Sequence, residues 1–590
     1  MSVRTGSLRS SLVLASLAAS LLSSSCRSRG VDVEEVLGSG LAESAQLDQE
    51  WHQGPSVAVD STGPARFVGG LMRAFDVDRA METVAYTDRF YRAPANDGYL
   101  AVLDHVRARL EEAGFGGEDE RFELREILTE MEVPSWTPRS GSIALHVAGA
   151  APEVLYTFSD GTEHDRTILP LGSPSCDVVG RICLNLDEIH EGDVFVTNAN
   201  LNQVYSRAMT RGAAAVISSF LPPYNIDPTG ADRHLDAVRY LRLSEPAELP
   251  VAQISANAYA RISAAVLADP EARLEFQADV GLEQRPMRTL VAAIRGAVRP
   301  DECVVSAAHI QEPGAGDNAS GVGGQVEGAI ATANLLRSDL LDWPDRTLVF
   351  IWGDEFEQTR VWIDDTERTA IAGVSSDMVG NSPSKTGARA LLERMPDPGA
   401  LYPILPDEHT PWGAGQVDRS MVNPSGLAVI ARCAMIDVGL HAGGWDSADH
   451  PWEGGSDHDV FIDRGIPAVL IWHFTDFSYH TSLDRMDMVD GAELERTQVA
   501  ILATMLAVAD PQPKDLDRYV RSAELERALR VARAEAEGDR DHVVAAWESW
   551  TRGAIGWLRS ECLGIPMDEA TPRRRPKPEE TQAPEGPVAD

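Results

Sequence analysis

The chain has 590 residues, which is more than one ordinary hydrophobic core requires, so we expect two or three domains. Its formal net charge is -39, and no long basic block interrupts the body of the chain. This charge argues against a nucleic-acid partner, whose phosphates would repel the protein. Six cysteines are too few for a disulfide scaffold, and no Cys pair has the spacing of a metal site. Any metal is therefore expected to be held by His and carboxylate.

The N-terminus has the pattern of an export signal over residues 1–26. Arg4 gives it a basic start, and residues 12–22 form an apolar run that is too short to span a bilayer. Small residues before Cys26 are typical of a bacterial lipoprotein cleavage site, although Ser23 stands where Leu is usual. Lipid attachment at Cys26 and a plain cleaved signal both stay open. The sequence predicts an exported protein of the cell envelope or periplasm, lipid-anchored or otherwise secreted.

The composition and the expected secondary structure then change several times along the chain. Residues 27–65 are acidic and irregular and suit a tether. A helical region follows, in which residues 99–110 have amphipathic spacing and Gly114 is placed to end the helix. Residues 131–285 contain short strand-like runs and read as a separate β-rich module.

Residues 286–510 alternate apolar runs with helical segments, which is the pattern of an α/β sheet. The apolar runs predict strands over residues 303–308, 346–352, 371–376 and 466–472. The first run leads into a Pro/Gly loop and then a helix of small residues, which we expect to be closely packed.

Each of these four strands is followed by ionisable residues. They are His309 with Asp317, Asp354 with Glu355, Asp377, and His480. Functional sites of open α/β sheets form at the carboxyl ends of strands, so we expect these side chains to meet there. Two His and at least three carboxylates suit a two-metal site in which one carboxylate bridges two cations.

The C-terminal part, residues 511–565, reads as helices over 516–537 and 541–560. Arg530 and its acidic neighbours are expected to form a solvated face. The tail from residue 566 to residue 590 is rich in Pro, Glu and Arg, a composition that favours disorder.

The β-rich module resembles a protease-associated domain. The resemblance rests on Gly-Asp-Val-Phe-Val at 192–196, Arg-Gly-Ala-Ala-Ala-Val-Ile at 211–217 and Leu-Pro-Val-Ala-Gln-Ile-Ser at 249–255. It implies a small module inserted in or attached to a peptidase. Cys176 and Cys183 lie in this module, and in an exported protein a local disulfide and two small buried thiols both stay open.

The order His, Asp-Asn-x-Ser-Gly, acidic pair, Asp-Met-Val-Gly and Tyr-His-Thr resembles the di-zinc aminopeptidases, metallopeptidase family twenty-eight, which includes aminopeptidase Y and glutamate carboxypeptidase types. The resemblance implies an α/β fold with a mixed, mostly parallel central sheet flanked by helices. The protease-associated module would be an insertion, and the C-terminal helices an extension. The peptidase domain would comprise residues 66–130 and 286–510.

The resemblance also implies two Zn²⁺ ions and a role for each motif. Asp317 would bridge both ions, His309 and Asp377 would complete one, and Glu355 and His480 the other. Two cations would polarise the scissile carbonyl and lower the pKa of a bridging water.

Asp354 would be the general base that takes the proton of this water. Here the sequence departs from the family, whose acidic pair is Glu-Glu, because Asp is one methylene shorter. Glu357 is a less favoured substitute for the base. A second departure is Gln311, which stands where the family has an Asp that orients the metal-bound imidazole; its amide oxygen is able to accept the same hydrogen bond. Tyr479 suits an oxyanion donor or simple packing beside the metal.

The leading hypothesis is therefore an exported zinc exopeptidase, an aminopeptidase acting on peptide substrates. A catalytically impaired, surface-anchored binding protein is a second hypothesis, which Gln311 and Asp354 keep open. A carboxypeptidase or a glutaminyl-cyclase-like enzyme on the same metal frame is a third.

Overall fold

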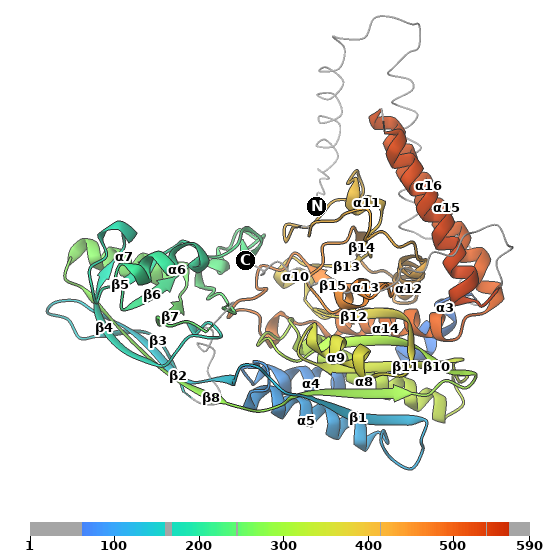
Figure 1. Ribbon diagram of the computed structural model, residues 1–590, viewed down its shortest axis with the longest axis horizontal. Helices are drawn as coiled ribbons and strands as arrows, with labels where there is room; N and C mark the ends of the chain where they lie inside the picture. Colours follow the sequence, from blue (N-terminus) through green and yellow to red (C-terminus); the bar gives the residue numbers. More distant parts are fainter. Residues whose placement is uncertain (1–61, 160–167, 244–245, 414, 539, 566–590) are drawn as a thin grey trace, which may run out of the picture.

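The computed structural model describes residues 62–159, 168–243, 246–413, 415–538 and 540–565. The predicted signal with Cys26, most of the tether and the predicted disordered tail lie outside these residues. None of the described helices is long and apolar enough to cross a membrane. The described chain forms two sheets, each accompanied by helices, and a projecting pair of C-terminal helices (Figure 1).

The large sheet has eight strands in the order β1-β9-β11-β10-β12-β15-β13-β14. The strands are β1 (Phe122–Thr129), β9 (Met287–Ile294), β10 (Arg299–His309), β11 (Arg346–Gly353), β12 (Thr369–Ser376), β13 (Arg389–Glu393), β14 (Ser447–His450) and β15 (Ala468–Phe474). Its central neighbours β11, β10, β12 and β15 are parallel to one another. β1 and β9 are antiparallel additions at one edge, and β13 runs antiparallel to β15. The predicted mixed, mostly parallel sheet is confirmed.

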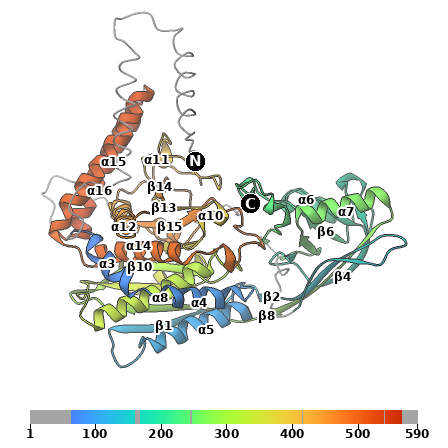
Figure 2. The ribbon, with the colours of Figure 1, turned by 180° about the vertical axis from the view of Figure 1, so that it is seen from behind.

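Successive side chains of a β-strand point to opposite faces of the sheet. The central strands therefore contribute side chains to two hydrophobic cores, one on each face. Val304 and Phe350 belong to the larger core, while Val305 and Ile351 pack on the other face with Trp362. Figure 2 shows several of the helices that cover the larger core lying along the sheet. These helices are α3 (Ala65–Ala74), α4 (Val77–Asp88), α5 (Asp97–Glu112), α8 (Ala319–Arg337), α12 (Leu427–His441) and α14 (Gly491–Ala509). The opposite face carries α9 (Glu357–Asp365) and α13 (His458–Asp463), and the short helices α10 (Pro383–Thr386) and α11 (Pro398–Leu401) lie in loops.

The small residues of α8 permit close approach of its neighbours. A Cβ added at Gly323 would lie 2.8 Å from the main-chain oxygen of Ala80 in α4. Most of α8 is buried between α4 and α14, as the run of small residues predicts. This packing fixes the amino end of α8, which directly follows Asp317.

A second sheet interrupts the chain between β1 and β9. Its strand order is β3-β2-β8-β4-β5-β6-β7. The strands are β2 (Ser135–His146), β3 (Glu153–Phe158), β4 (Cys176–Cys183), β5 (Val194–Thr197), β6 (Ala215–Ser218), β7 (Val251–Gln253) and β8 (Arg273–Glu283), with helices α6 (Leu201–Thr210) and α7 (Ala256–Ala268). The paired strands β2 and β8 lead away from the large sheet and back to it (Figure 1). We call residues 130–286 the inserted unit.

Cys176 and Cys183 are both free thiols in the structure. They stand at the two ends of β4, and an extended strand rises about 3.3 Å per residue. Seven such steps separate the two residues by far more than the roughly 7 Å over which two Cα atoms can be bridged. Cys176 and Cys183 are therefore two separate thiols, and the local disulfide does not form.

The C-terminal helices α15 (Leu516–Glu537) and α16 (Asp541–Trp557) pack against each other and form the projecting pair. The expectation of a solvated face at Arg530 is wrong. Arg530 is fully buried and donates to both carboxylate oxygens of Asp407. The charge pattern alone did not reveal that a distant loop supplies the acidic partner.

Candidate metal centre

The carboxyl ends of the four central strands bring the predicted site residues together. β10 ends at His309, Asp354 follows β11 directly, and Asp377 follows β12. His480 lies on the loop that leaves β15. Because these strands are parallel neighbours, their carboxyl ends share one edge of the sheet.

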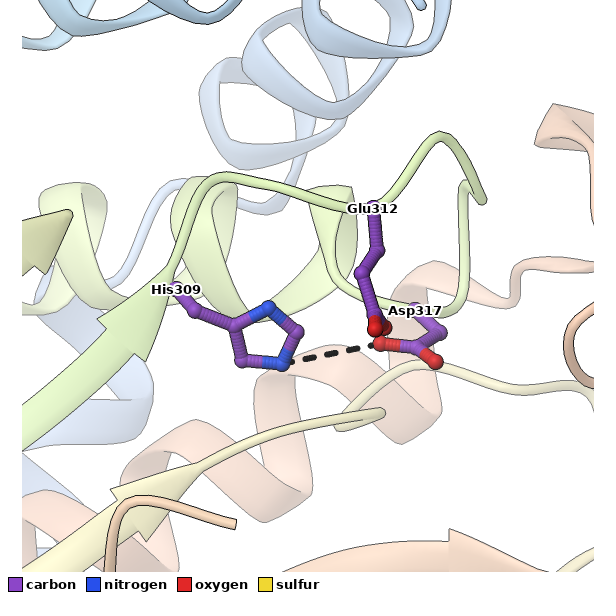
Figure 3. Close-up of side chains that lie close together, drawn as sticks. All are labelled: His309, Glu312 and Asp317. Carbon is purple, nitrogen blue, oxygen red and sulfur yellow. Dashed lines mark ion pairs between the residues drawn. The ribbon is translucent and has the colours of Figure 1, made fainter. Parts of the chain in front are cut away.

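The first group is centred on the imidazole of His309. Its Nε2 lies 3.3 Å from Oδ1 of Asp377, 3.6 Å from Oδ1 of Asp317 and 3.8 Å from Oε1 of Glu355. Figure 3 shows the imidazole pointing toward Asp317. His309 Nε2 and both of these Oδ1 atoms are buried and have no hydrogen-bond partner.

The tautomer of His309 follows from its other nitrogen. Nδ1 lies 3.0 Å from the main-chain oxygen of Gln311, and a carbonyl only accepts, so Nδ1 carries a proton and Nε2 is the nitrogen that faces the carboxylates. Several carboxylate oxygens thus meet in a buried space, an arrangement that is costly without a positive charge among them. Ligand atoms about 2.0–2.1 Å from a tetrahedral zinc lie about 3.3 Å apart, so the residues fit such an ion.

The second group is centred on His480. Its Nε2 lies 3.0 Å from Oδ2 of Asp317 and 3.1 Å from Oε2 of Glu312. The two oxygens of Asp317 therefore face different imidazoles, Oδ1 toward His309 and Oδ2 toward His480. This is the arrangement that a carboxylate bridging two cations requires.

Glu312 is a site residue that the sequence prediction missed. Figure 3 shows it descending from the loop after β10 to lie beside Asp317. The available signal was its position next to Gln311, where an acid follows one residue later than the expected Asp.

Asp354 is buried, and its Oδ1 has no hydrogen-bond partner. Burial raises the pKa of its carboxyl to about 6. A carboxylate with a pKa nearer neutrality accepts a proton more readily than an ordinary Asp does. The predicted base is thus placed at the same sheet edge with a free oxygen and a suitable proton affinity.

The contact of Gln311 differs from the one expected. Its main-chain oxygen, rather than its amide, orients His309. The side chain instead holds Glu355: its Oε1 accepts from the main-chain N–H of Glu355 at 2.7 Å, and its Nε2 donates to Oε2 of Glu355 at 3.3 Å. The amide side chain at position 311 therefore leaves the imidazole oriented.

Further residues hold the acidic groups in place. Asp484 accepts from the main-chain N–H of Asp317 at 2.9 Å, and Ser456 donates its hydroxyl to Oδ2 of Asp377 at 2.9 Å. Asp457 accepts from the main-chain N–H of Phe356 at 3.0 Å, which fixes the turn after Glu355. Each of these contacts joins segments that are far apart in the chain.

Tyr479 packs beside the second group. Its ring stacks on His480 with centroids 4.0 Å apart and meets Phe474 edge-on at 5.6 Å. Burial, together with the nearby carboxylate of Asp317, raises the pKa of its phenol well above the usual value, so the hydroxyl keeps its proton as a donor. Tyr479 therefore packs beside the site, as one of its two predicted roles requires. Its other predicted role, as an oxyanion donor, remains a prediction.

The inserted unit forms part of the site. The main-chain N–H of Tyr240 donates to the oxygen of His480 at 2.7 Å, and Ser482 donates to Val238 at 2.8 Å. The Tyr240 ring meets the His480 ring edge-on at 5.5 Å. A pocket beside the second group is lined by Tyr240 together with Glu312, Asp317 and His480. The loop that carries His480 is therefore held between the two parts of the protein.

Another buried group of acids and His lies at the ends of β13 and β14, formed by Glu393, His450 and Glu453. Here hydrogen bonds occupy several of the ligand atoms, although Oε2 of Glu393 and Nδ1 of His450 have no hydrogen-bond partner. Trp472 donates to Nε2 of His450 at 3.0 Å, so His450 Nδ1 carries the proton and neither nitrogen is free for a metal. His458 contacts Oε1 of Glu393 at 2.9 Å. We interpret this group as a structural polar cluster.

His458 is expected to make stability depend on pH. Burial alone would lower its pKa, but the carboxylates of Asp459 and Glu393 outweigh burial and raise the pKa to about 9. A raised pKa stabilises the fold below the unfolded value of about 6.5, and this stabilisation is lost as the pH rises through 9. We expect the melting temperature to fall less between pH 6.5 and pH 9.5 in His458→Gln than in the wild type. The exposed His441→Gln is the control, and an unchanged pH slope in His458→Gln would contradict the assignment.

Comparison with known proteins gave likenesses of structure only. No family model matches the chain, and no curated protein matches it. An aminopeptidase from Aneurinibacillus sp. strain AM-1 is 16% identical, with a TM-score of 0.45, over 75% of this chain and 97% of that chain. A zinc aminopeptidase from Bacillus subtilis is 14% identical, with a TM-score of 0.48, over 75% and 96%.

A peptidase M28 precursor from Shewanella amazonensis SB2B is 14% identical, with a TM-score of 0.49, over 81% of this chain and 98% of that chain. These TM-scores lie below 0.5 and the identities below 25%, so the likenesses carry no argument about the function of this chain. The argument for function rests on the residues of the site.

Proposed function

We propose that the chain is an exported, zinc-dependent exopeptidase of the family twenty-eight type, an aminopeptidase that hydrolyses peptide bonds with two zinc ions. The observation that carries the proposal is the placement of Asp317 between two imidazoles. One of its oxygens faces His309 and the other faces His480, and further carboxylates surround both positions. Cation binding explains why buried oxygens of Asp317 and Asp377 face the same imidazole without a hydrogen-bond partner.

The two cations, when bound, would polarise the scissile carbonyl and lower the pKa of a water shared between them. Asp354, whose Oδ1 has no hydrogen-bond partner, would accept a proton from the attacking water and pass it to the leaving amine. Gln311 holds Glu355, and Asp484 holds the main chain of Asp317, so the acids keep their positions during the reaction. Tyr479 is proposed to donate its hydroxyl to the developing oxyanion.

The charge of the site favours the amino end of a peptide. Five carboxylates and two neutral imidazoles surround two divalent cations, which leaves a net negative charge. The carboxylates are Glu312, Asp317, Asp354, Glu355 and Asp377. A free ammonium group is attracted to such a site, whereas a free carboxylate is repelled. This argument supports an aminopeptidase over a carboxypeptidase.

The remaining parts of the proposal rest on the sequence. The signal at residues 1–26 supports export, and Cys26 supports a lipid anchor in the cell envelope. The motifs in the inserted unit support a protease-associated domain, and the contacts of Tyr240 support a role for this unit in limiting access to the site.

Metal removal tests the proposal directly. Purified protein should contain about two equivalents of zinc, and a chelator should remove the zinc and the hydrolysis of aminoacyl reporter substrates together, because the reaction needs both cations. Added zinc should restore both. Full activity of the metal-free protein would contradict the proposal.

A panel of substrates separates the alternatives. Release of carboxyl-terminal residues would replace the aminopeptidase with a carboxypeptidase, and cyclisation of amino-terminal glutamine would indicate a cyclase. If the zinc-loaded protein hydrolyses no substrate of the panel, this result would favour the hypothesis of a catalytically impaired binding protein.

A further inference from the structure

We propose that Asn225, a residue of the inserted unit, is a positioning residue for Tyr479 and sets the place of its hydroxyl beside the metal centre. This inference rests on the proposed function, in which Tyr479 donates to the developing oxyanion. It gives the inserted unit a part in the reaction itself, beyond limiting access to the site.

The side chain of Asn225 holds the loop of Tyr479 by its main chain. Its Nδ2 donates to the main-chain oxygen of Phe477 at 2.9 Å and to that of Tyr479 at 2.8 Å. Asn225 is only 1% exposed, and hydrogen bonds that are shielded from water are stronger than exposed ones. One amide that bonds two carbonyls of the same turn fixes both the position and the direction of that turn.

The residue before Asn225 contacts the ring of the same tyrosine. The Tyr224 ring lies 5.8 Å from the Tyr479 ring and 5.9 Å from the Phe474 ring, measured between centroids. Tyr479 is thus held at its main chain by Asn225 and at its ring by Tyr224. Two successive residues of the inserted unit therefore determine where the Tyr479 hydroxyl lies.

The segment that carries Asn225 is itself fixed. Residues 222–223 are both proline, and the proline ring restricts the backbone. Further along the segment, Arg233 donates to the main-chain oxygen of Lys385 at 2.7 Å, and its guanidinium lies 4.4 Å from the centre of the Phe477 ring. These contacts attach the segment to the part of the protein that contains the large sheet. The amide of Asn225 is therefore offered to the loop from a fixed position.

The turn around Tyr479 also has hydrogen bonds of its own. Asp476 accepts from the main-chain N–H of Ser478 at 2.7 Å and from its hydroxyl at 2.6 Å. The hydroxyl of Thr481 donates to the main-chain oxygen of Ser478 at 2.7 Å. Because these bonds do not involve the inserted unit, loss of the Asn225 amide should displace Tyr479 without unfolding the turn.

The test is a double-mutant cycle on the zinc-loaded full chain, with steady-state hydrolysis of an aminoacyl reporter substrate as the measurement. Asn225→Asp keeps the shape of the side chain but replaces the donor with an acceptor, and Asn225→Ala removes the amide without adding a charge. We expect each variant to lower kcat by about 10–10²-fold with KM nearly unchanged, because a displacement of about 1 Å at a reacting group has an effect of this order. Asn202→Asp, at an exposed Asn of the inserted unit, is the matched control and should keep the wild-type kcat.

Tyr479→Phe decides whether Asn225 acts through the hydroxyl. Alone, this variant should lower kcat by about 10²–10³-fold, the usual effect of losing an oxyanion donor. Combined with it, the substitutions of Asn225 should lower kcat no further, because the group that they displace is already absent. If the two losses multiply instead, Asn225 supports the site as a whole and the inference is wrong.

Wild-type kcat in both Asn225 variants would also overturn the inference, and so would loss of bound zinc from them, since Asn225 would then act through the metal. Circular dichroism and the melting temperature check the fold of each variant. If the buried charge of Asn225→Asp prevents folding, Asn225→Ala decides the result. A wild type that binds no zinc and hydrolyses no reporter would contradict the proposed function, whereas an active wild type with unresponsive variants contradicts the inference alone.

Discussion

Asp354→Asn is expected to keep both metal ions and lower kcat by about 10²–10⁴-fold, the usual contribution of a general base. Asp354 belongs to neither group of candidate ligands, so metal content should not change. Asn matches Asp in shape but cannot accept the proton of the attacking water. The measurement is zinc content and steady-state hydrolysis on the same preparation, and full activity of the variant would show that the base is misassigned.

Glu357→Gln is the matched control for this variant. Glu357 lies three residues after Asp354, at the start of α9, where it pairs with Arg360. Its neutralisation should leave turnover unchanged. The pH profile gives an independent readout: wild-type kcat/KM should fall below about pH 6, or lower still with cations bound, because a protonated Asp354 cannot act as a base. This acid limb should be absent in Asp354→Asn.

Asp317→Asn is expected to abolish hydrolysis and to reduce zinc to one equivalent or fewer. The amide offers a single oxygen, so it cannot face both imidazoles as a ligand, and its nitrogen would meet a cation on one side. We expect a loss of at least about 10³-fold in kcat/KM, because both ions depend on this side chain.

The fold around Asp317 should survive the substitution. Asp484 holds the main-chain N–H of Asp317 rather than its side chain, so this hydrogen bond remains in the variant. Asp339→Asn, an exposed residue after α8, is the control for the same chemical change. Retention of two tightly bound zinc ions in Asp317→Asn would contradict the bridging role.

Much of the sheet was predictable because its central strands are buried on both faces and read as nearly continuous apolar runs. The predicted runs at 303–308, 346–352 and 371–376 fall within β10, β11 and β12, and the run at 466–472 overlaps β15. The edge strands β1 and β14, and β13 beside β14, gave no such signal. β1 is partly exposed along most of its length, and β13 and β14 have only five and four residues, so their composition is less distinctive.

The errors share one cause, which is contact between distant segments. Arg530 reads as a surface residue until Asp407 is folded against it. Glu312 reads as a loop acid until the left-handed turn places it beside His480. Tyr240 lies in the inserted unit, and nothing near it in the chain indicates that it lines the same pocket as Asp317.

The sequence by itself determined which chemistry is available at the sheet edge. His309, Asp354 and Asp377 follow apolar runs, and parallel strands necessarily bring such ends together. Only the tertiary structure decided how these groups pair. The contacts of Glu312 with His480 and of Glu355 with Gln311 depend on loop conformation and join segments far apart in the chain, which local patterns of polarity do not encode.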